Sequence, residues 1–126
     1  MALFFELPVY KASYDLFVCI FAYAHHFNKE YKYTVGEKLK EETIEMITNI
    51  YRANSRTDKT ELLQNARENI EVIRLLFRLL KDLKQIDLKN FVAINTKIEN
   101  VSKQLAGWQK SVIRHDKKQH PIDNVQ

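Results

Sequence analysis

The sequence predicts an all-α protein, an up-down-up-down antiparallel four-helix bundle, and three observations lead to this prediction. The 126 residues include only two glycines and two prolines, fewer than the many tight turns of a β-rich fold require. Apolar residues recur three and four positions apart along four long segments, as they do on one face of a helix. Short polar links join these segments, which favours antiparallel packing of consecutive helices.

The first predicted helix begins at Pro8, a residue tolerated in a first turn because its missing N–H has no partner there. The helix ends near Asn28 and carries two apolar stripes. The stripe expected to face the core is Tyr10, Tyr14, Phe17, Phe21 and Ala24. The neighbouring stripe is Leu16, Ile20, Tyr23 and Phe27. A small bundle has little to cover a second stripe, so we expect this one to form a subunit interface.

The second and third helices each begin with a pattern typical of a capping box. Thr34 with Glu37 starts the second helix, and Asp58 with Glu61 starts the third, which continues to about Lys84. The inward stripe of the second helix is Leu39, Thr43, Met46, Ile50 and Ala53. That of the third is Leu62, Ala66, Ile70, Ile73, Phe77 and Leu80.

The fourth predicted helix follows Asp87 and has the most regular apolar pattern. Its stripe is Phe91, Ile94, Ile98, Val101, Leu105, Trp108 and Val112. Alternating steps of three and four give the seven-residue repeat of bundles and coiled coils. The periodicity is lost after Arg114, and Pro121 follows. We therefore expect a bundle over residues 1–114 and a disordered tail over residues 115–126.

The single cysteine and the short apolar runs indicate a cytoplasmic protein without a membrane partner. Cys19 alone excludes an internal disulfide framework, and its apolar surroundings predict a buried, inert thiol. The apolar run Leu16–Ala24 has nine residues, too few to span a bilayer. The amino terminus lacks the basic start and small-residue cleavage site of a secretory signal.

No arrangement of residues predicts catalysis or a cofactor. His25 and His26 are adjacent, so on a helix they point about 100° apart and cannot grip one metal ion together. The sequence has no Glu-x-x-His pair and no glycine-rich phosphate loop. We expect no catalytic residues, no metal ligands and no cofactor, and hence a protein that works by binding.

The second half of the chain carries the excess positive charge. Residues 1–57 hold seven acids and seven bases, whereas residues 58–126 hold nine acids and 13 bases. Bases that repeat every one or two turns can follow a phosphate backbone. The candidate nucleic-acid-binding residues are Arg67, Arg74, Arg78, Lys81, Lys84, Lys89, Lys103 and Lys110. A solvated face that only keeps the protein soluble fits these rows equally well.

Three segments together resemble the accessory variability determinant (Avd) proteins of diversity-generating retroelements. They are Tyr33–Leu39, at the start of the second helix, Ile73–Leu83, where arginines interrupt leucines, and Leu105–Lys110 around Trp108. Ala106 stands where the family has the first glycine of a Gly-Gly-Trp segment. The resemblance extends over about residues 7–114.

The resemblance implies a homopentameric barrel that binds a reverse transcriptase and RNA or DNA. It assigns Arg74, Arg78 and Lys81 to nucleic-acid contacts, Gly36 to close packing or entry into the second helix, and Trp108 to the core. The alternative is a structural or protein-interaction module of the kind encoded in ribosomal RNA intervening sequences, with the same fold and an unknown partner. The residues alone leave both possibilities open.

Overall fold

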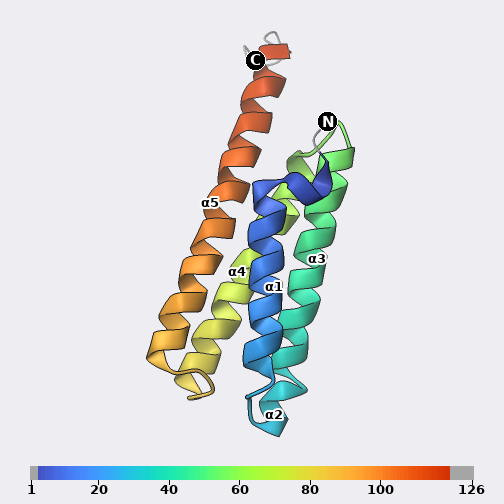
Figure 1. The fold of residues 1–126 in the computed structure, drawn as a ribbon. Coiled ribbons are helices and arrows are strands. Elements are labelled where there is room, and N and C mark those ends of the chain that lie inside the picture. The colour runs from blue at the N-terminus through green and yellow to red at the C-terminus, as the bar shows by residue number, and fades with distance from the viewer. Residues whose placement is uncertain (1–2, 120–126) are drawn as a thin grey trace.

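A computed structural model describes residues 3–119, and these residues form helices without any strand. A short 3-10 helix, η1, precedes five α-helices (Figure 1). Their bounds are η1 Phe4–Glu6, α1 Pro8–Ala24, α2 Lys29–Lys32, α3 Val35–Ser55, α4 Thr60–Asp82 and α5 Leu88–Gln119. The four long helices α1, α3, α4 and α5 confirm the predicted all-α four-helix bundle.

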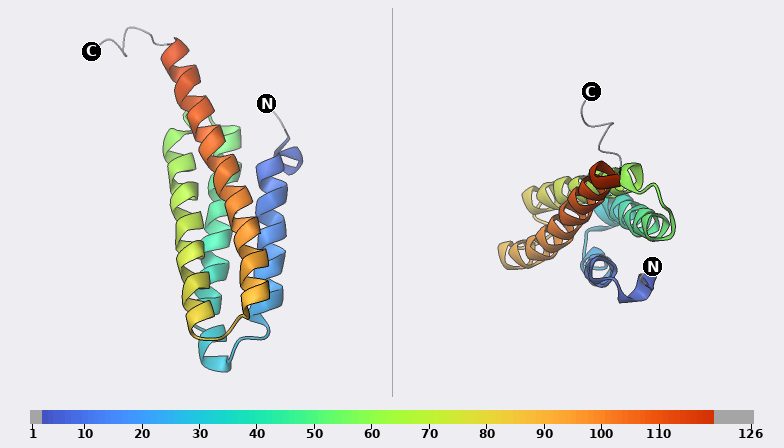
Figure 2. Two further views of the ribbon diagram at one scale, coloured as in Figure 1. Left: turned by 90° about the vertical axis from the view of Figure 1, so that its left-hand side faces the viewer. Right: turned by 90° about the horizontal axis from the view of Figure 1, so that it is seen from above.

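The four long helices alternate in direction, and each packs against two others. The order around the bundle is α1, α3, α4 and α5, and α5 closes it by packing against α1. Figure 2 shows these helices side by side, with the carboxyl-terminal turns of α5 extending past the end of the bundle. The pairs α1–α3 and α4–α5 therefore form opposite halves of the molecule.

The helices begin at or next to the predicted residues, but the predicted capping interactions are only partly present. Pro8 is the first residue of α1, and Thr34 is the N-cap of α3. The Thr34 hydroxyl, however, donates to the carbonyl oxygen of Glu30 at 2.6 Å, so the predicted capping box is absent. The N-cap of α4 is Lys59, one residue after the predicted Asp58. The Asp87 cap is confirmed, since its carboxylate accepts the N–H of Asn90 at 2.8 Å.

The core contains most of the predicted inward residues. The full predicted stripe of α3 is buried, and the stripes of α4 and α5 are buried over their middle turns. On α4, Leu63 is fully buried and the predicted Leu62 only partly. Trp108 is half-buried and packs against this core, as expected. A Cβ added at Gly36 would lie 3.3 Å from the Tyr31 carbonyl oxygen, so this glycine does serve close packing.

The predicted subunit interface on α1 is wrong. Leu16 and Ile20 are fully buried, and Phe27 is 5% exposed, all within one subunit. Tyr23 is half-buried and packs against the same core. Leu16, Ile20 and Phe27 are enclosed by their own bundle and have almost no surface left for a second copy, and Tyr23 keeps only part of its surface. The stripe therefore belongs to the core of the subunit.

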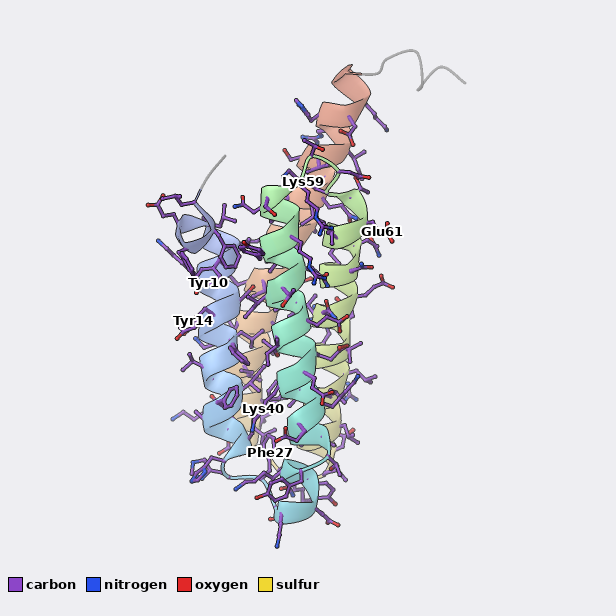
Figure 3. All side chains as sticks on the ribbon, turned by 90° about the vertical axis from the view of Figure 1, so that its right-hand side faces the viewer. Tyr10, Tyr14, Phe27, Lys40, Lys59 and Glu61 are labelled. Carbon is purple, nitrogen blue, oxygen red and sulfur yellow. The ribbon has the colours of Figure 1, made fainter. Side chains whose placement is uncertain are left out.

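The stripe of α1 that was expected to face the core is only partly buried. Tyr14 and Phe21 are 52% and 47% exposed, as is the neighbouring Val18 at 50%, whereas Ala24 is buried. Figure 3 shows Tyr10 and Tyr14 on the outer side of α1. The physical reason is that aliphatic side chains fill a core without polar atoms, whereas a buried tyrosine hydroxyl needs a partner. The helix is apolar on two sides, as predicted, but Leu16, Ile20 and Phe27 face the core, while Tyr14 and Phe21 lie toward solvent.

The helix α5 is longer than predicted. It continues through Gln119, five residues beyond Arg114, where the loss of apolar periodicity predicted a tail. The part of a helix that extends beyond its neighbours no longer needs an apolar face. The loss of apolar periodicity therefore marks where packing ends and not where the helix ends. The remainder of the predicted tail, residues 120–126, lies outside the described residues.

Candidate nucleic-acid interface

Arg74 lies in the middle of α4 and is held by two acids. Its guanidinium forms an ion pair with Glu71 at 3.1 Å, one turn earlier on α4, and another with Glu99 on α5. Two carboxylates around one guanidinium cancel its positive charge and occupy its donors. Arg74 therefore joins α4 to α5, and little of its charge is left for a phosphate.

The bases that follow Arg74 on α4 differ in how closely they contact neighbouring side chains. Arg78 lies 3.7 Å from the carboxylate of Asp82, although its side chain is 66% exposed. The Lys81 ammonium lies 5.0 Å from the centre of the Phe91 ring, a cation–π distance. Lys84 is exposed in the turn before α5. The row predicted on this helix thus exists, with its charge reduced by neighbouring acids.

Arg67 sits at the opposite end of α4 and has a polar partner. Its guanidinium donates to the side-chain oxygen of Gln109 on α5 at 2.5 Å. Gln109 is buried, and its amide nitrogen donates to Gln64 at 3.1 Å and to the Thr60 carbonyl oxygen at 3.3 Å. This network fixes Arg67 between the two helices without neutralising it.

Three predicted bases on α5, Lys89, Lys103 and Lys110, are exposed, and no ion pair joins them to an acid of residues 3–119. Lys110 lines a groove between the start of α4 and the end of α5. The other residues lining it are Arg67, Ala106, Gln109, Ile113, Arg114 and Lys117. Arg114 and Lys117 were not among the predicted site residues. The sequence alone could have indicated them, because they follow Lys110 by four and seven positions and so lie on the same side of the helix.

A second groove lies between α4 and α5 and is lined by Glu71, Arg74, Leu75, Arg78, Phe91 and Asn95. The predicted residues thus do not form one site. Arg74, Arg78 and Lys81 gather near this groove, whose lining mixes two bases, one acid and two apolar side chains. Arg67 and Lys110 line the other groove, which is basic.

The groups that could perform chemistry are dispersed. Among residues 3–117, no three His, Cys, Asp or Glu side chains come together as a metal site. His25 and His26 are exposed at the end of α1, with ring centres 5.3 Å apart. Burial raises the pKa of the Cys19 thiol, which keeps it protonated and poorly nucleophilic at neutral pH. None of the helices between residues 3 and 119 combines the length and the continuous apolar character that a membrane span requires.

Comparison with known proteins places the chain in a family. No protein of curated function matches it. The model of the family described as bAvd-like matches residues 9–112, a range that extends from the first turn of α1 almost to the end of the packed part of α5. The matched range includes α3 and α4 in full and most of α1 and α5, and the chain therefore belongs to the bAvd-like family.

Proposed function

We propose that this protein is a non-enzymatic, cytoplasmic accessory factor of a diversity-generating retroelement. It assembles as a homopentameric ring, binds the reverse transcriptase of the element, and holds template RNA or complementary DNA on basic surfaces. Membership of the bAvd-like family over residues 9–112 carries this proposal. The distribution of apolar side chains and charge over the surface of the subunit supports it.

Two separate apolar faces support assembly into a ring. The aromatic face, on α1 and α3, consists of Tyr14, Val18, Phe21, Ile44 and Tyr51, each between 47% and 55% exposed. The leucine face, on α4 and α5, consists of Leu75, Leu79, Leu88 and Val92, each between 41% and 68% exposed. Large exposed apolar side chains favour association. Two different faces on opposite halves of a subunit favour head-to-tail contacts, which close into rings.

The net charge supports an anionic partner once copies associate. One chain carries +4, so five copies carry about +20. Lys89, Lys103 and Lys110 have no acidic partner among the described residues, and a ring repeats each of them five times. Repetition turns single weak phosphate contacts into a multivalent surface without any new residue type.

Binding to structured RNA over a salt series tests the nucleic-acid part of the proposal. We expect binding at 50 mM salt that weakens steeply by 200 mM, because each neutralised phosphate releases a counterion. Binding that is absent at 50 mM salt, or that does not change with salt, contradicts phosphate contact.

Association with the reverse transcriptase encoded nearest to the gene tests the remaining part. We expect the two proteins to co-elute from a sizing column and complementary-DNA synthesis on an RNA template to rise when both are present. A protein that binds neither RNA nor this enzyme is instead an interaction module of the ribosomal intervening-sequence kind.

A further inference from the structure

Five exposed residues form one continuous row along α5. Their spacing of four, three, four and three positions keeps them on a single side of the helix. They are Lys103, Gly107, Lys110, Arg114 and Lys117, named here the α5 cation row. Val101 and Leu105, which are fully buried, point the opposite way. The row therefore faces away from the core along its whole length.

The charge of Lys103, Lys110 and Arg114 in this row is not cancelled by described acids as charge is on α4. Between Lys103 and Lys117 the sequence holds four Lys or Arg residues and one acid, Asp116. No ion pair joins Lys103, Lys110 or Arg114 to a described acid, whereas Arg74 on α4 is paired with both Glu71 and Glu99. Three positive charges on one side of α5 are therefore left without a described acidic partner.

A further cation borders the row from the neighbouring helix. Arg67 of α4 lines the same groove as Lys110, Arg114 and Lys117. Its hydrogen bond to the buried Gln109 fixes one N–H group and leaves the other guanidinium donors for a ligand. Cations on both walls of one groove suit an anionic chain lying along it.

Gly107 interrupts the row of long side chains at a position where glycine has no role within the subunit. A Cβ added there would meet nothing within 4 Å. A glycine inside a helix costs about 1 kcal/mol relative to alanine, and the fold itself requires none here. With Lys103 and Lys110 on either side, the missing side chain opens a gap in which another backbone can approach the helix closely.

We propose that the α5 cation row, with Arg67, seats the phosphodiester backbone of the bound nucleic acid, and that Gly107 is the point of closest approach. This inference rests on the proposed function and assigns its phosphate contacts to α5 instead of to Arg74, Arg78 and Lys81, named here the α4 row. From Lys103 to Lys117 the row is about 21 Å long. That length equals the rise of about six nucleotides along one strand of a duplex. The helix carries the end of the row past the bundle (Figure 1).

Two double variants with equal loss of charge test the assignment. Lys110→Gln with Arg114→Gln alters the α5 cation row, and Arg78→Gln with Lys81→Gln alters the α4 row. For duplex RNA, we expect the α5 pair to lower the slope of log affinity against log salt by about two and the affinity roughly tenfold or more. We expect the α4 pair to change the slope by less than half as much. Equal losses, or a larger loss in the α4 pair, overturn the assignment.

Gly107→Leu tests the close approach separately. Leucine favours helix and meets open space at this position, so thermal unfolding monitored by circular dichroism should show a fold at least as stable as that of the unaltered protein. The affinity for RNA should nevertheless fall several-fold. An unchanged affinity overturns the role given to Gly107.

The outcomes separate this inference from the proposed function. If the unaltered protein binds RNA and only the α4 pair weakens binding, the proposed function stands and the assignment to α5 falls. If the unaltered protein binds no RNA but binds phosphatidylserine vesicles through the same α5 residues, the row is a membrane-surface site, and both proposals are wrong about nucleic acid.

Discussion

The ammonium of Lys59 lies 2.5 Å from the carbonyl oxygen of Ala53 and 2.5 Å from that of Arg56. Lys59 is the N-cap of α4, while Ala53 belongs to the last turn of α3 and Arg56 is its C-cap. One side chain thus satisfies carbonyl groups that the end of α3 leaves without helical partners. Figure 3 shows Lys59 at the turn between these two helices.

Removing this charge should weaken the α3–α4 turn. We expect Lys59→Met to lower the free energy of unfolding by about 1–2 kcal/mol, because hydrogen bonds from a charged donor and the favourable helix-end charge are both lost. Urea denaturation measures the change. Lys38→Met, at an exposed position within α3, is the matched control and should change stability by less than about 0.5 kcal/mol. Equal effects in the two variants contradict a capping role.

The buried Asn69 on α4 should be intolerant of an apolar replacement. Its side-chain oxygen accepts the amide of the buried Asn49 on α3 at 3.0 Å, and its own amide lies 3.3 Å from the Glu45 carboxylate. Asn69→Leu leaves these groups without a partner, at a cost of about 1–3 kcal/mol. Thermal unfolding should show this loss, whereas Asn65→Leu, exposed one turn earlier, should be nearly neutral. A neutral Asn69→Leu contradicts the importance of this buried link.

A glycine in place of Lys84 should stabilise the turn between α4 and α5. Lys84 has a φ of 60°, the left-handed conformation that costs most residues about 1 kcal/mol and glycine nothing. The turn is fixed by the N–H of Gln85 donating to the Leu80 carbonyl oxygen at 2.8 Å. We expect Lys84→Gly to raise the free energy of unfolding by about 0.5–1 kcal/mol. Lys84→Ala removes the same charge without relieving the backbone and should give no gain.

The ion pair between α1 and α5 should contribute to stability until strongly alkaline pH. Lys97 donates to the Asp15 carboxylate at 2.6 Å, and this hydrogen bond raises the pKa of Lys97 above its ordinary value of 10.5. A raised pKa stabilises the fold below the ordinary value, and the contribution is lost as pH rises through the folded-state pKa.

Asp15→Asn tests this pH dependence. Both side chains are partly exposed, so we expect the variant to be less stable by less than about 1 kcal/mol between pH 7 and 9. The difference should disappear above the pKa of Lys97. Urea denaturation of both proteins from pH 7 to above the pKa of Lys97 measures the difference, and a difference that grows at alkaline pH contradicts the assignment.

The fold followed from the sequence because its main signal is local. Periodicity located the four long helices, and the buried α3 stripe is the one predicted. The orientation of α1 did not follow, because both of its sides are apolar and periodicity alone cannot choose between them. Chemistry could have decided, since the side that faces outward holds Tyr10 and Tyr14, whose hydroxyls favour solvent.

The candidate site was harder to predict because the acids that cancel a base can be far from it in the sequence. Glu99 neutralises Arg74 from 25 positions away, across the α4–α5 contact, and no spacing rule reveals that pair. The α5 cation row, by contrast, is visible in the sequence from Lys103 to Lys117. Lys103 and Lys110 were predicted, whereas Lys117 was not, because the expected tail began at residue 115.

Sedimentation velocity of the full chain at micromolar concentration most directly tests whether copies associate through their exposed apolar faces and pool their positive charge. The account predicts one species of about 75 kDa, five times the 15.0 kDa of a single chain. It further predicts that Phe21→Glu, on the aromatic face, shifts that species toward the monomer while the helical content is retained. A 15.0 kDa monomer for the unaltered protein contradicts the ring and, with it, the pooled charge.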